Sequence, residues 1–272
     1  MAIWDAVAKV RGLPLFRLLA SAFGTIEPLD SVPVYAGGGY YFPADDLGCL
    51  RAEMAYFRDA GFTAAKIKIG ARRLQEDCVR IETALNVLGS GTALAVDAMN
   101  SYQPGPARDV ARALEPYGLR WFEDVCDPLD YETHADLASM YAPPLSAGEA
   151  LFSLSDARNL LRYGGLRKGH DVLTFDPVHS YGIAGFVEIV RHFQEAGWSR
   201  GQFQPHGGHL FGLHVAAGLA LGGCECNPHN FQPFGGFFDG AVIQGGRIAP
   251  PEWLGIGCEA RASLMDLFRT VF

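Results

Sequence analysis

The sequence predicts a parallel α/β barrel, in which strands and helices alternate and the sheet closes on itself. The chain has 272 residues, a length at which single α/β barrels are common. Short apolar runs alternate with amphipathic segments along most of it, which indicates repeated strand–helix units and a parallel sheet with right-handed crossovers. An ionisable residue ends each of six successive expected strands. Six such residues can converge on one centre only if the sheet closes, and the strand ends are where barrel enzymes place their chemistry.

The expected strands share a short, largely apolar pattern, and a helical pattern follows each one. We expect strands at residues 32–36, 64–69, 93–97, 119–123, 145–149, 172–176 and 202–206. We expect the following helices at residues 47–60, 73–88, 107–114, 131–141, 155–163, 184–196 and 210–221. Two short helices, at residues 3–10 and 15–21, precede this repeat and do not fit it.

The polar strand ends recur in phase with the repeat. They are Lys68, Asp97, Glu123, Glu149, Asp176 and His206. Successive members are 29, 26, 26, 27 and 30 residues apart, which is close to one strand–helix unit each time.

Three of these residues form a candidate metal site. Asp97, Glu123 and Glu149 end three consecutive strands, and each lies within an apolar stretch. A single strand-end carboxylate is as well explained by a salt bridge or a solvated position, but three in phase would repel one another without a cation. Oxygen ligands without His or Cys suit Mg²⁺.

A pair of lysines lies on the strand before the carboxylates. Lys66 and Lys68 are two residues apart, so both side chains point to the same face of a buried strand. Burial and mutual repulsion are expected to lower the pKa of at least one, making a neutral amine available as a base. The alternative is that both extend to solvent from an edge strand.

A carboxylate and an imidazole end the next two strands in the predicted order. Asp176 beside His206 would fix the tautomer of the ring and raise its basicity, which suits a general acid or base. His209, three residues later, is a weaker candidate and is expected to begin the following helix. Glu225 would lie near an eighth strand, where it is either a hydrogen-bonding group or a loop carboxylate. Residues 37–39 are three glycines, which we interpret as a flexible substrate loop rather than a phosphate-binding motif.

Bulk composition excludes several classes of partner. The net charge of −8 argues against binding to nucleic acid or to an anionic membrane. No segment has the roughly 18 uncharged apolar residues of a membrane span, and the N-terminus does not resemble a signal peptide. The six cysteines are scattered, so we expect reduced thiols and a cytoplasmic protein.

The motifs together resemble those of the enolase superfamily, mandelate racemase group, and within it the D-tartrate dehydratases. The Lys-x-Lys strand, the three carboxylates and the Asp/His pair follow the site plan of that group. The resemblance extends over essentially the whole chain. The segments that carry it are IWDAVAKVRGLPLFRLL (residues 3–19), YAGGGYY (35–41), DARNLLRYGG (156–165), PHGGH (205–209) and FQPFGGF (231–237).

The resemblance implies a modified TIM barrel of the (β/α)7β type and a hydro-lyase that acts on a small acid sugar. Lys68 would remove the proton α to a carboxylate, giving an ene-diolate stabilised by Mg²⁺ on Asp97, Glu123 and Glu149. His206, oriented by Asp176, would protonate the departing β-hydroxyl, and the product would become a 2-keto acid.

Substrate contacts are expected from Lys66, Glu225 and Asn100. Two readings stay open beside this one: an α-hydroxy-acid racemase with the same lysine and Asp/His pair, and an inactive barrel that serves as a binding or assembly partner. The sequence also departs from the pattern, with Asp97-Ala-Met99-Asn100 where Asp-Ala-Asn is common and Ala150 where Asn is common.

The resemblance also implies an N-terminal α+β capping domain, and we expect the sequence to begin at the helix that follows most of it. We therefore expect residues 1–30 to be a helical remnant of the linker or cap, and residues 31–245 to form the barrel. Residues 246–272 are expected to pack back toward the cap. The sequence would then be a fragment or a natural truncation, and its uncovered barrel surface would favour a homo-oligomer.

Overall fold

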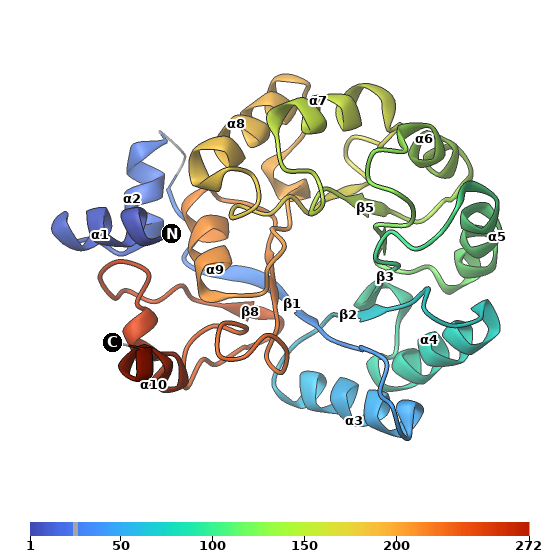
Figure 1. Ribbon diagram of the computed structural model, residues 1–272, viewed down its shortest axis with the longest axis horizontal. Coiled ribbons are helices and arrows are strands. Elements are labelled where there is room, and N and C mark those ends of the chain that lie inside the picture. Colours follow the sequence, from blue (N-terminus) through green and yellow to red (C-terminus); the bar gives the residue numbers. More distant parts are fainter. Residues whose placement is uncertain (24–26, 272) are drawn as a thin grey trace.

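The computed structural model describes residues 1–23 and 27–271 and contains a sheet bent into a ring (Figure 1). Within the described residues, seven strands of the sheet are parallel. Their order is β6-β5-β4-β3-β2-β1-β7, and β8 pairs antiparallel with β1. The strands are β1 (Val32–Gly37), β2 (Ala65–Lys68), β3 (Leu94–Asp97), β4 (Phe122–Glu123), β5 (Leu145–Ala147), β6 (Val172–Leu173), β7 (Cys224–Cys226) and β8 (Arg247–Ile248).

The sheet closes through a short segment between β6 and β7. Phe203 forms a parallel bridge with Leu173, and the Gln204 N–H donates to the Leu173 carbonyl over 2.9 Å. On the other side, the Glu225 N–H donates to the Pro205 carbonyl over 3.3 Å. The expected strand at residues 202–206 is thus reduced to these few bonds, because Pro205 has no N–H to donate to a ladder. The ring is nevertheless complete, and the prediction of a (β/α)7β barrel is confirmed.

Helices surround the ring of strands, as Figure 1 shows. They are α3 (Asp46–Asp59), α4 (Leu74–Leu88), α5 (Pro104–Leu114), α6 (Tyr131–Met140), α7 (Leu154–Tyr163), α8 (Gly182–Glu195) and α9 (Leu210–Gly218). Their starts follow from local sequence: α5 begins at a proline, and α7 begins with a reciprocal capping box between Ser153 and Asp156. Every residue of α9 is buried, because α2 (Leu15–Ala22) packs on its outer side.

Both ends of the described chain lie on one side of the barrel (Figure 1). α1 (Ala2–Val10) and α2 correspond to the two helices expected before the barrel, and α10 (Ala262–Val271) ends the described chain. Leu13 and Leu15 exchange backbone hydrogen bonds with Gly255, so the two terminal segments pack together. The domain limits remain a prediction, and residues 24–26 and 272 within them lie outside the described residues. Of the helices described, none is both long enough and apolar enough to cross a membrane.

The strand register brings the polar ends to one level. Lys68 pairs with Asp97, and Asp97 pairs with Glu123 on the next strand. Because side chains alternate along a strand, the residues two positions earlier point to the same inner face. A small buried cluster of Tyr35, Ala64, Ala95 and Trp121 fills this face below the polar layer. Polar residues therefore meet at the C-terminal ends of the strands, over an apolar floor.

Candidate active site and metal centre

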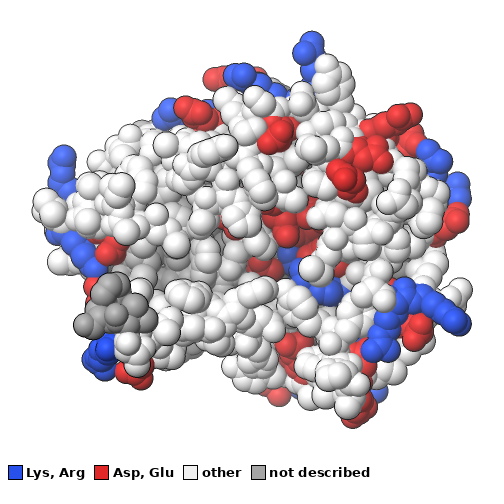
Figure 2. All heavy atoms as spheres, in the orientation of Figure 1, with Lys and Arg blue, Asp and Glu red and all other residues white. Residues whose placement is uncertain are grey.

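Three carboxylates meet at the centre of the barrel. Asp97 ends β3, Glu123 ends β4 and Glu149 follows β5, and one oxygen from each lies within 4.8 Å of the others. Asp97 and Glu123 are fully buried. Figure 2 shows acidic and basic side chains together in a hollow in the middle of the face that Figure 1 presents.

Neighbouring groups hold two of the carboxylates in place and leave the third open. The Met99 N–H donates to Asp97 Oδ1 over 2.8 Å, and the Trp121 Nε1–H donates to Glu123 Oε2 over 2.6 Å. Glu149 Oε2 is buried and has no hydrogen-bond partner among the described residues. Three convergent carboxylates, one with an unsatisfied buried oxygen, fit a hard divalent cation such as Mg²⁺.

Both lysines point into the same cluster. Lys66 Nζ lies 2.6 Å from Glu123 Oε1, 3.3 Å from Glu225 Oε1 and 3.7 Å from Asp97 Oδ2. Lys68 Nζ is paired with Asp97 Oδ2. Both lysines are buried, so the alternative in which they extend to solvent is wrong.

The prediction that one lysine has a lowered pKa is also wrong for the geometry of these side chains. Burial lowers the pKa of Lys66, but the carboxylates of Glu123 and Glu225 outweigh it and raise the pKa above its ordinary value. Burial and Lys66 lower the pKa of Lys68, but Asp97 and Glu225 raise it further. The number of carboxylates around the pair, rather than repulsion between the lysines, decides the direction.

The carboxylates respond to the same cluster in opposite ways. Burial would raise the pKa of Asp97, but Lys66 and Lys68 hold it below the ordinary value. Burial and the nearby carboxylates raise the pKa of Glu123 to about 8, despite its contact with Lys66. Burial is the main reason that the charged form of Glu123 is disfavoured, and repulsion from the other acids adds to it. A bound cation would favour the charged form.

An imidazole–carboxylate pair stands on the other side of the three carboxylates. His206 Nδ1 lies 2.8 Å from Asp176 Oδ2, and His206 Nε2 lies 3.5 Å from Glu149 Oε2. Burial would lower the pKa of His206, but the hydrogen bond with Asp176 and the charges of Glu225 and Glu149 raise it to about 9. The pair can therefore hold a proton beside the carboxylate centre.

The other expected substrate contacts differ in how close they come. Glu225 joins the centre, because Oε1 contacts Lys66 and Oε2 accepts from the Gly207 N–H over 3.2 Å. For Asn100, the backbone N–H donates to the Asp124 carbonyl over 2.6 Å. Its side-chain Oδ1 is buried without a hydrogen-bond partner in the described part of the chain. A substrate role for Asn100 stays a prediction. His209 caps α9 by accepting from the Gly212 N–H over 3.0 Å, which confirms that it begins the helix.

The triple glycine is not a flexible loop. All three residues are buried: Gly37 ends β1, and Gly38 and Gly39 follow it. The Gly39 N–H donates to Glu53 Oε2 over 2.7 Å, and the Gly39 carbonyl accepts from the Lys68 N–H over 3.2 Å. A Cβ on Gly37 would meet Asn227 and Glu225 at 2.1 and 2.5 Å, so glycine is required by close packing rather than by mobility.

Four residues near the centre were not expected from the sequence: Trp121, Tyr35, Tyr40 and His179. The Tyr35 ring lies over Lys66 and edge-on to Trp121, while the Tyr40 ring lies 5.4 Å from Lys68 Nζ. The His179 ring lies 5.9 Å from the His206 ring. The signal for Trp121 was present, because it lies two residues before Glu123 on the same strand. Tyr35 has no such signal, because no site residue was expected on its strand. Nothing comparable marks His179, which lies in the loop after β6.

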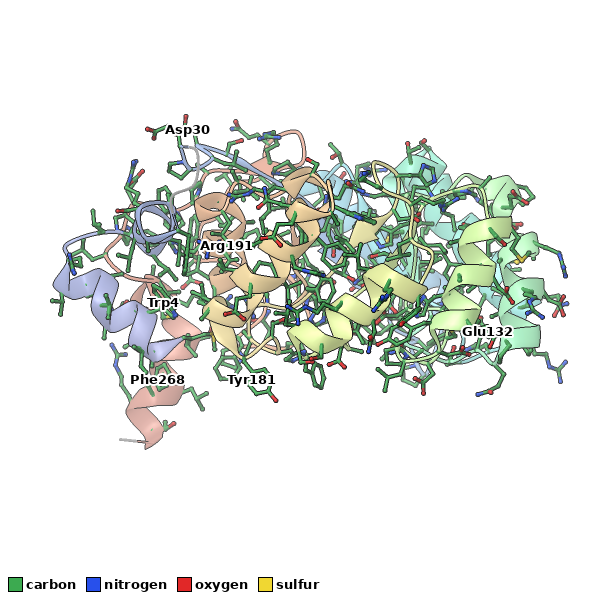
Figure 3. The ribbon with its side chains drawn as sticks, turned by 90° about the horizontal axis from the view of Figure 1, so that it is seen from above. Trp4, Asp30, Glu132, Tyr181, Arg191 and Phe268 are labelled. Atoms are coloured by element: carbon green, nitrogen blue, oxygen red, sulfur yellow. The ribbon has the colours of Figure 1, made fainter. Side chains whose placement is uncertain are left out.

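The site occupies the face of the barrel at the C-terminal ends of the strands. In Figure 3, Tyr181, from the loop after β6, lies on one face, and Asp30, just before β1, lies on the opposite face. This is the face at which α/β barrel enzymes place their active sites. The polar residues of the site therefore gather at the C-terminal ends of the barrel strands and in the adjoining loops.

Comparison with known proteins identifies the family. The family model described as "Enolase C-terminal domain-like" matches residues 50–264, and the chain belongs to this family. Arabinonate dehydratase of Saccharolobus solfataricus is 28% identical over 98% of this chain and 70% of its own length. L-talarate/galactarate dehydratase of Salmonella typhimurium is 30% identical over 81% of this chain, which spans about half (52%) of that relative.

Solved structures agree with this assignment. L-talarate dehydratase from Polaromonas sp. JS666, complexed with Mg and L-glucarate, superposes with a TM-score of 0.76 at 28% identity, covering 94% of this chain and 67% of that one. A racemase from Streptomyces coelicolor A3(2) with bound magnesium has the same TM-score at 27% identity, covering 94% and 69%. The homologues thus include both acid-sugar dehydratases and racemases of the mandelate racemase group.

Proposed function

We propose that the protein is a Mg²⁺-dependent acid-sugar dehydratase that converts a small sugar acid to a 2-keto acid. One arrangement carries the proposal: a lysine and a histidine approach the same three-carboxylate centre from different sides. Lys68 contacts Asp97, while His206 lies 3.5 Å from Glu149. A substrate held at the centre would have a proton acceptor on one side and a proton donor on the other.

Lys68 is the base in this proposal, and His206 is the acid. The neutral amine of Lys68 takes the proton from the α-carbon, and the electron pair left behind forms the C=C bond of an enol. His206 gives its proton to the β-hydroxyl, which leaves as water. The enol then takes up a proton at carbon and becomes the 2-keto acid, so one water is lost overall.

The residues of the metal centre and its neighbours support these two steps. Asp97, Glu123 and Glu149 would hold Mg²⁺, whose charge stabilises the negative charge that develops on the substrate and favours a neutral Lys68. Lys66, which is buried beside Glu123, would offset the charge of the substrate carboxylate. Asp176 is hydrogen-bonded to Nδ1 of His206, so Nε2 is the ring nitrogen that faces the three carboxylates.

For the substrate we propose D-tartrate first, and longer aldonic and aldaric acids next. The support for D-tartrate is the sequence resemblance of the site segments, such as PHGGH at residues 205–209. Longer acids are supported by the names of the relatives, which include arabinonate and L-talarate/galactarate dehydratases. This chain spans only 70% and 52% of the lengths of those two relatives. That it has an activity like that of the whole relatives is therefore also a proposal.

The direct test is formation of a 2-keto acid from a panel of acid sugars, with Mg²⁺ and with excess EDTA. The panel contains D-tartrate, arabinonate, galactonate, galactarate and L-talarate. We expect turnover of at least one acid, none in EDTA, and none for Lys68→Ala. Lys168→Ala is the matched control, because Lys168 is an exposed lysine away from the centre. Full turnover in EDTA would disprove the metal assignment.

Racemisation is the second candidate. Lys68 and His206 would also suit it, since one would remove the α-proton and the other would return a proton to the opposite side of the same carbon. A racemase with bound magnesium shares the fold. In that case His206 would return a proton to the α-carbon. The panel separates the two: a racemase inverts the α-carbon and incorporates solvent deuterium without releasing a 2-keto acid. An inactive barrel would do neither.

A further inference from the structure

A second group of potential metal ligands lies beside the carboxylate centre. Asp176, His179 and His206 each offer one ligand atom, and these atoms lie within 4.8 Å of one another. Asp176 Oδ2 lies 2.8 Å from His206 Nδ1 and 3.9 Å from His179 Nδ1. His179 has no part in the proposed dehydration, so its place in this group calls for a separate explanation.

The separations match a small tetrahedral ion. Zn²⁺ binds His nitrogen at about 2.0–2.1 Å and carboxylate oxygen at about 2.0–2.2 Å, which puts tetrahedral ligand atoms roughly 3.3 Å apart. The distances of 2.8 and 3.9 Å lie on either side of that value. The adjustment needed is therefore about half an ångström at each of these two contacts, and the two histidine nitrogens lie within 4.8 Å of each other.

The surroundings allow this adjustment and favour a cation. Asp176 Oδ1 accepts from the Val178 and His179 N–H groups over 2.5 and 3.3 Å, so the carboxylate is fixed with Oδ2 turned to the histidines. The His179 side chain is 45% exposed, and its Nδ1 lies 3.3 Å from the Glu149 carbonyl, which can only accept a hydrogen bond. Binding of a metal to this nitrogen would replace that long hydrogen bond and release its proton. Glu149 adds a carboxylate oxygen 3.5 Å from His206 Nε2.

The ligand type separates this group from the carboxylate centre. Two imidazoles and one carboxylate suit Zn²⁺, Co²⁺ and related ions, whereas three carboxylates suit Mg²⁺. We propose that Asp176, His179 and His206 form a second metal site, selective for Zn²⁺ over Mg²⁺, whose occupation inhibits the enzyme. The inhibition follows because a metal on His206 replaces its hydrogen bond with Asp176 and removes it from proton transfer. The inhibition rests on the proposed dehydratase function, whereas binding of Zn²⁺ to this site is independent of it.

The test measures binding without substrate. Protein freed of metal with a chelator is saturated with Mg²⁺ at pH 8, where a metal that binds His206 must still displace its proton. Zn²⁺ is then titrated by calorimetry, and Co²⁺ by its visible absorption. We expect one equivalent of Zn²⁺ that Mg²⁺ does not displace, and a Co²⁺ spectrum typical of four-coordinate nitrogen and oxygen ligation. Asp97→Asn should weaken Mg²⁺ binding and leave this equivalent in place.

Two histidine variants decide whether the assignment is correct. His179→Gln should lose the Mg²⁺-resistant equivalent, keep its turnover and become at least tenfold less sensitive to Zn²⁺. His229→Gln is the matched control, because His229 is 41% exposed and its Nδ1 lies 3.6 Å from the Glu53 carboxylate. No third ligand joins these two among residues 1–23 and 27–271. The control variant should bind Zn²⁺ like the wild type.

Two results would overturn the inference: no Mg²⁺-resistant equivalent in the wild type, or an unchanged equivalent in His179→Gln. If the wild type binds this Zn²⁺ and His179→Gln does not, but no acid sugar turns over, the metal site stands and the proposed dehydratase function fails.

Discussion

Trp121 donates a hydrogen bond from its indole Nε1 to Oε2 of Glu123, two residues further along the same strand, over 2.6 Å. Both side chains are buried, and Lys66 contacts the other oxygen of the same carboxylate. Each oxygen of Glu123 thus has a donor of its own, which fixes the plane of the carboxylate toward the centre. Groups that orient a ligand in this way tune metal affinity.

Trp121→Phe should therefore weaken Mg²⁺ binding by about 10–100-fold, the range found when such a supporting partner is lost. Calorimetric titration of the metal-free protein measures this directly. Tyr35→Phe is the matched control, because Tyr35 packs edge-on against Trp121 but its hydroxyl is buried without a hydrogen-bond partner among the described residues. An equal loss in both variants would mean that packing, and not the indole hydrogen bond, supports the carboxylate.

The two proton-transfer roles can be separated by mutation. Lys68→Ala should abolish both turnover and exchange of the α-proton with solvent deuterium, because the first step is lost. His206→Asn should reduce turnover by about 10²–10⁴-fold, the usual contribution of a general acid, while Lys68 still exchanges the α-proton. Mass spectrometry of recovered substrate reports the exchange. Dehydration by His206→Asn at the wild-type rate would exclude His206 as the acid, and His170→Asn, an exposed histidine elsewhere, serves as control.

The pH dependence of turnover should follow His206. The hydrogen bond with Asp176 and nearby carboxylates outweigh burial and raise the His206 pKa to about 9. The proton that the acid must donate is therefore present below about pH 9 and is lost as the pH rises through that value. Asp176→Asn removes the hydrogen bond that raises the His206 pKa most and leaves the charges of Glu225 and Glu149, so the alkaline limb of kcat should move to lower pH. If the alkaline limb does not move in this variant, a group other than His206 is responsible for it.

The glycine segment after β1 should prove rigid. Gly39 has φ +61°, and a Cβ there would lie 2.4 Å from Cβ of Ile67, whereas Gly89 has φ +84° with open space around it. Gly89→Ala should cost about 1 kcal/mol of unfolding free energy from backbone conformation alone. Gly39→Ala should cost about 1–3 kcal/mol more because of the steric overlap. Urea denaturation compares the two, and equal losses would mean that the segment yields readily.

The sequence predicted the parts of the site that repeat with the fold. Asp97, Glu123 and Asp176 lie at or just beyond the ends of their strands, and the alternation of apolar and amphipathic segments locates those strands. A closed sheet brings these strand ends together, so the prediction of a barrel also predicted that the three residues converge. The same reasoning anticipated the burial of Lys66 and Lys68, because their strand is apolar on both sides.

The remaining features depend on three-dimensional neighbours. The pKa direction of the lysines required a count of the carboxylates around each ammonium group, which spacing does not provide. His179 reaches His206 through the path of a loop, and loop paths are not periodic. The triple glycine was misread because composition cannot distinguish a glycine that moves from one that is enclosed; the side chains of Ile67 and Glu225 decide it.

The closed sheet has a consequence for how the protein folds. β1 and β7 pair directly, with Tyr35 opposite Glu225, although these residues are far apart in the chain. Such a distant pairing has a large loop-closure entropy and tends to form late. Until it forms, Lys66 lacks one of its carboxylate partners and the segment carrying His206 has no neighbour on that side. Asp97, Glu123 and Glu149 should therefore come together before the ring closes, because β3, β4 and β5 pair as neighbours in the chain. The Glu225 contact of Lys66 should be added only when β1 and β7 pair.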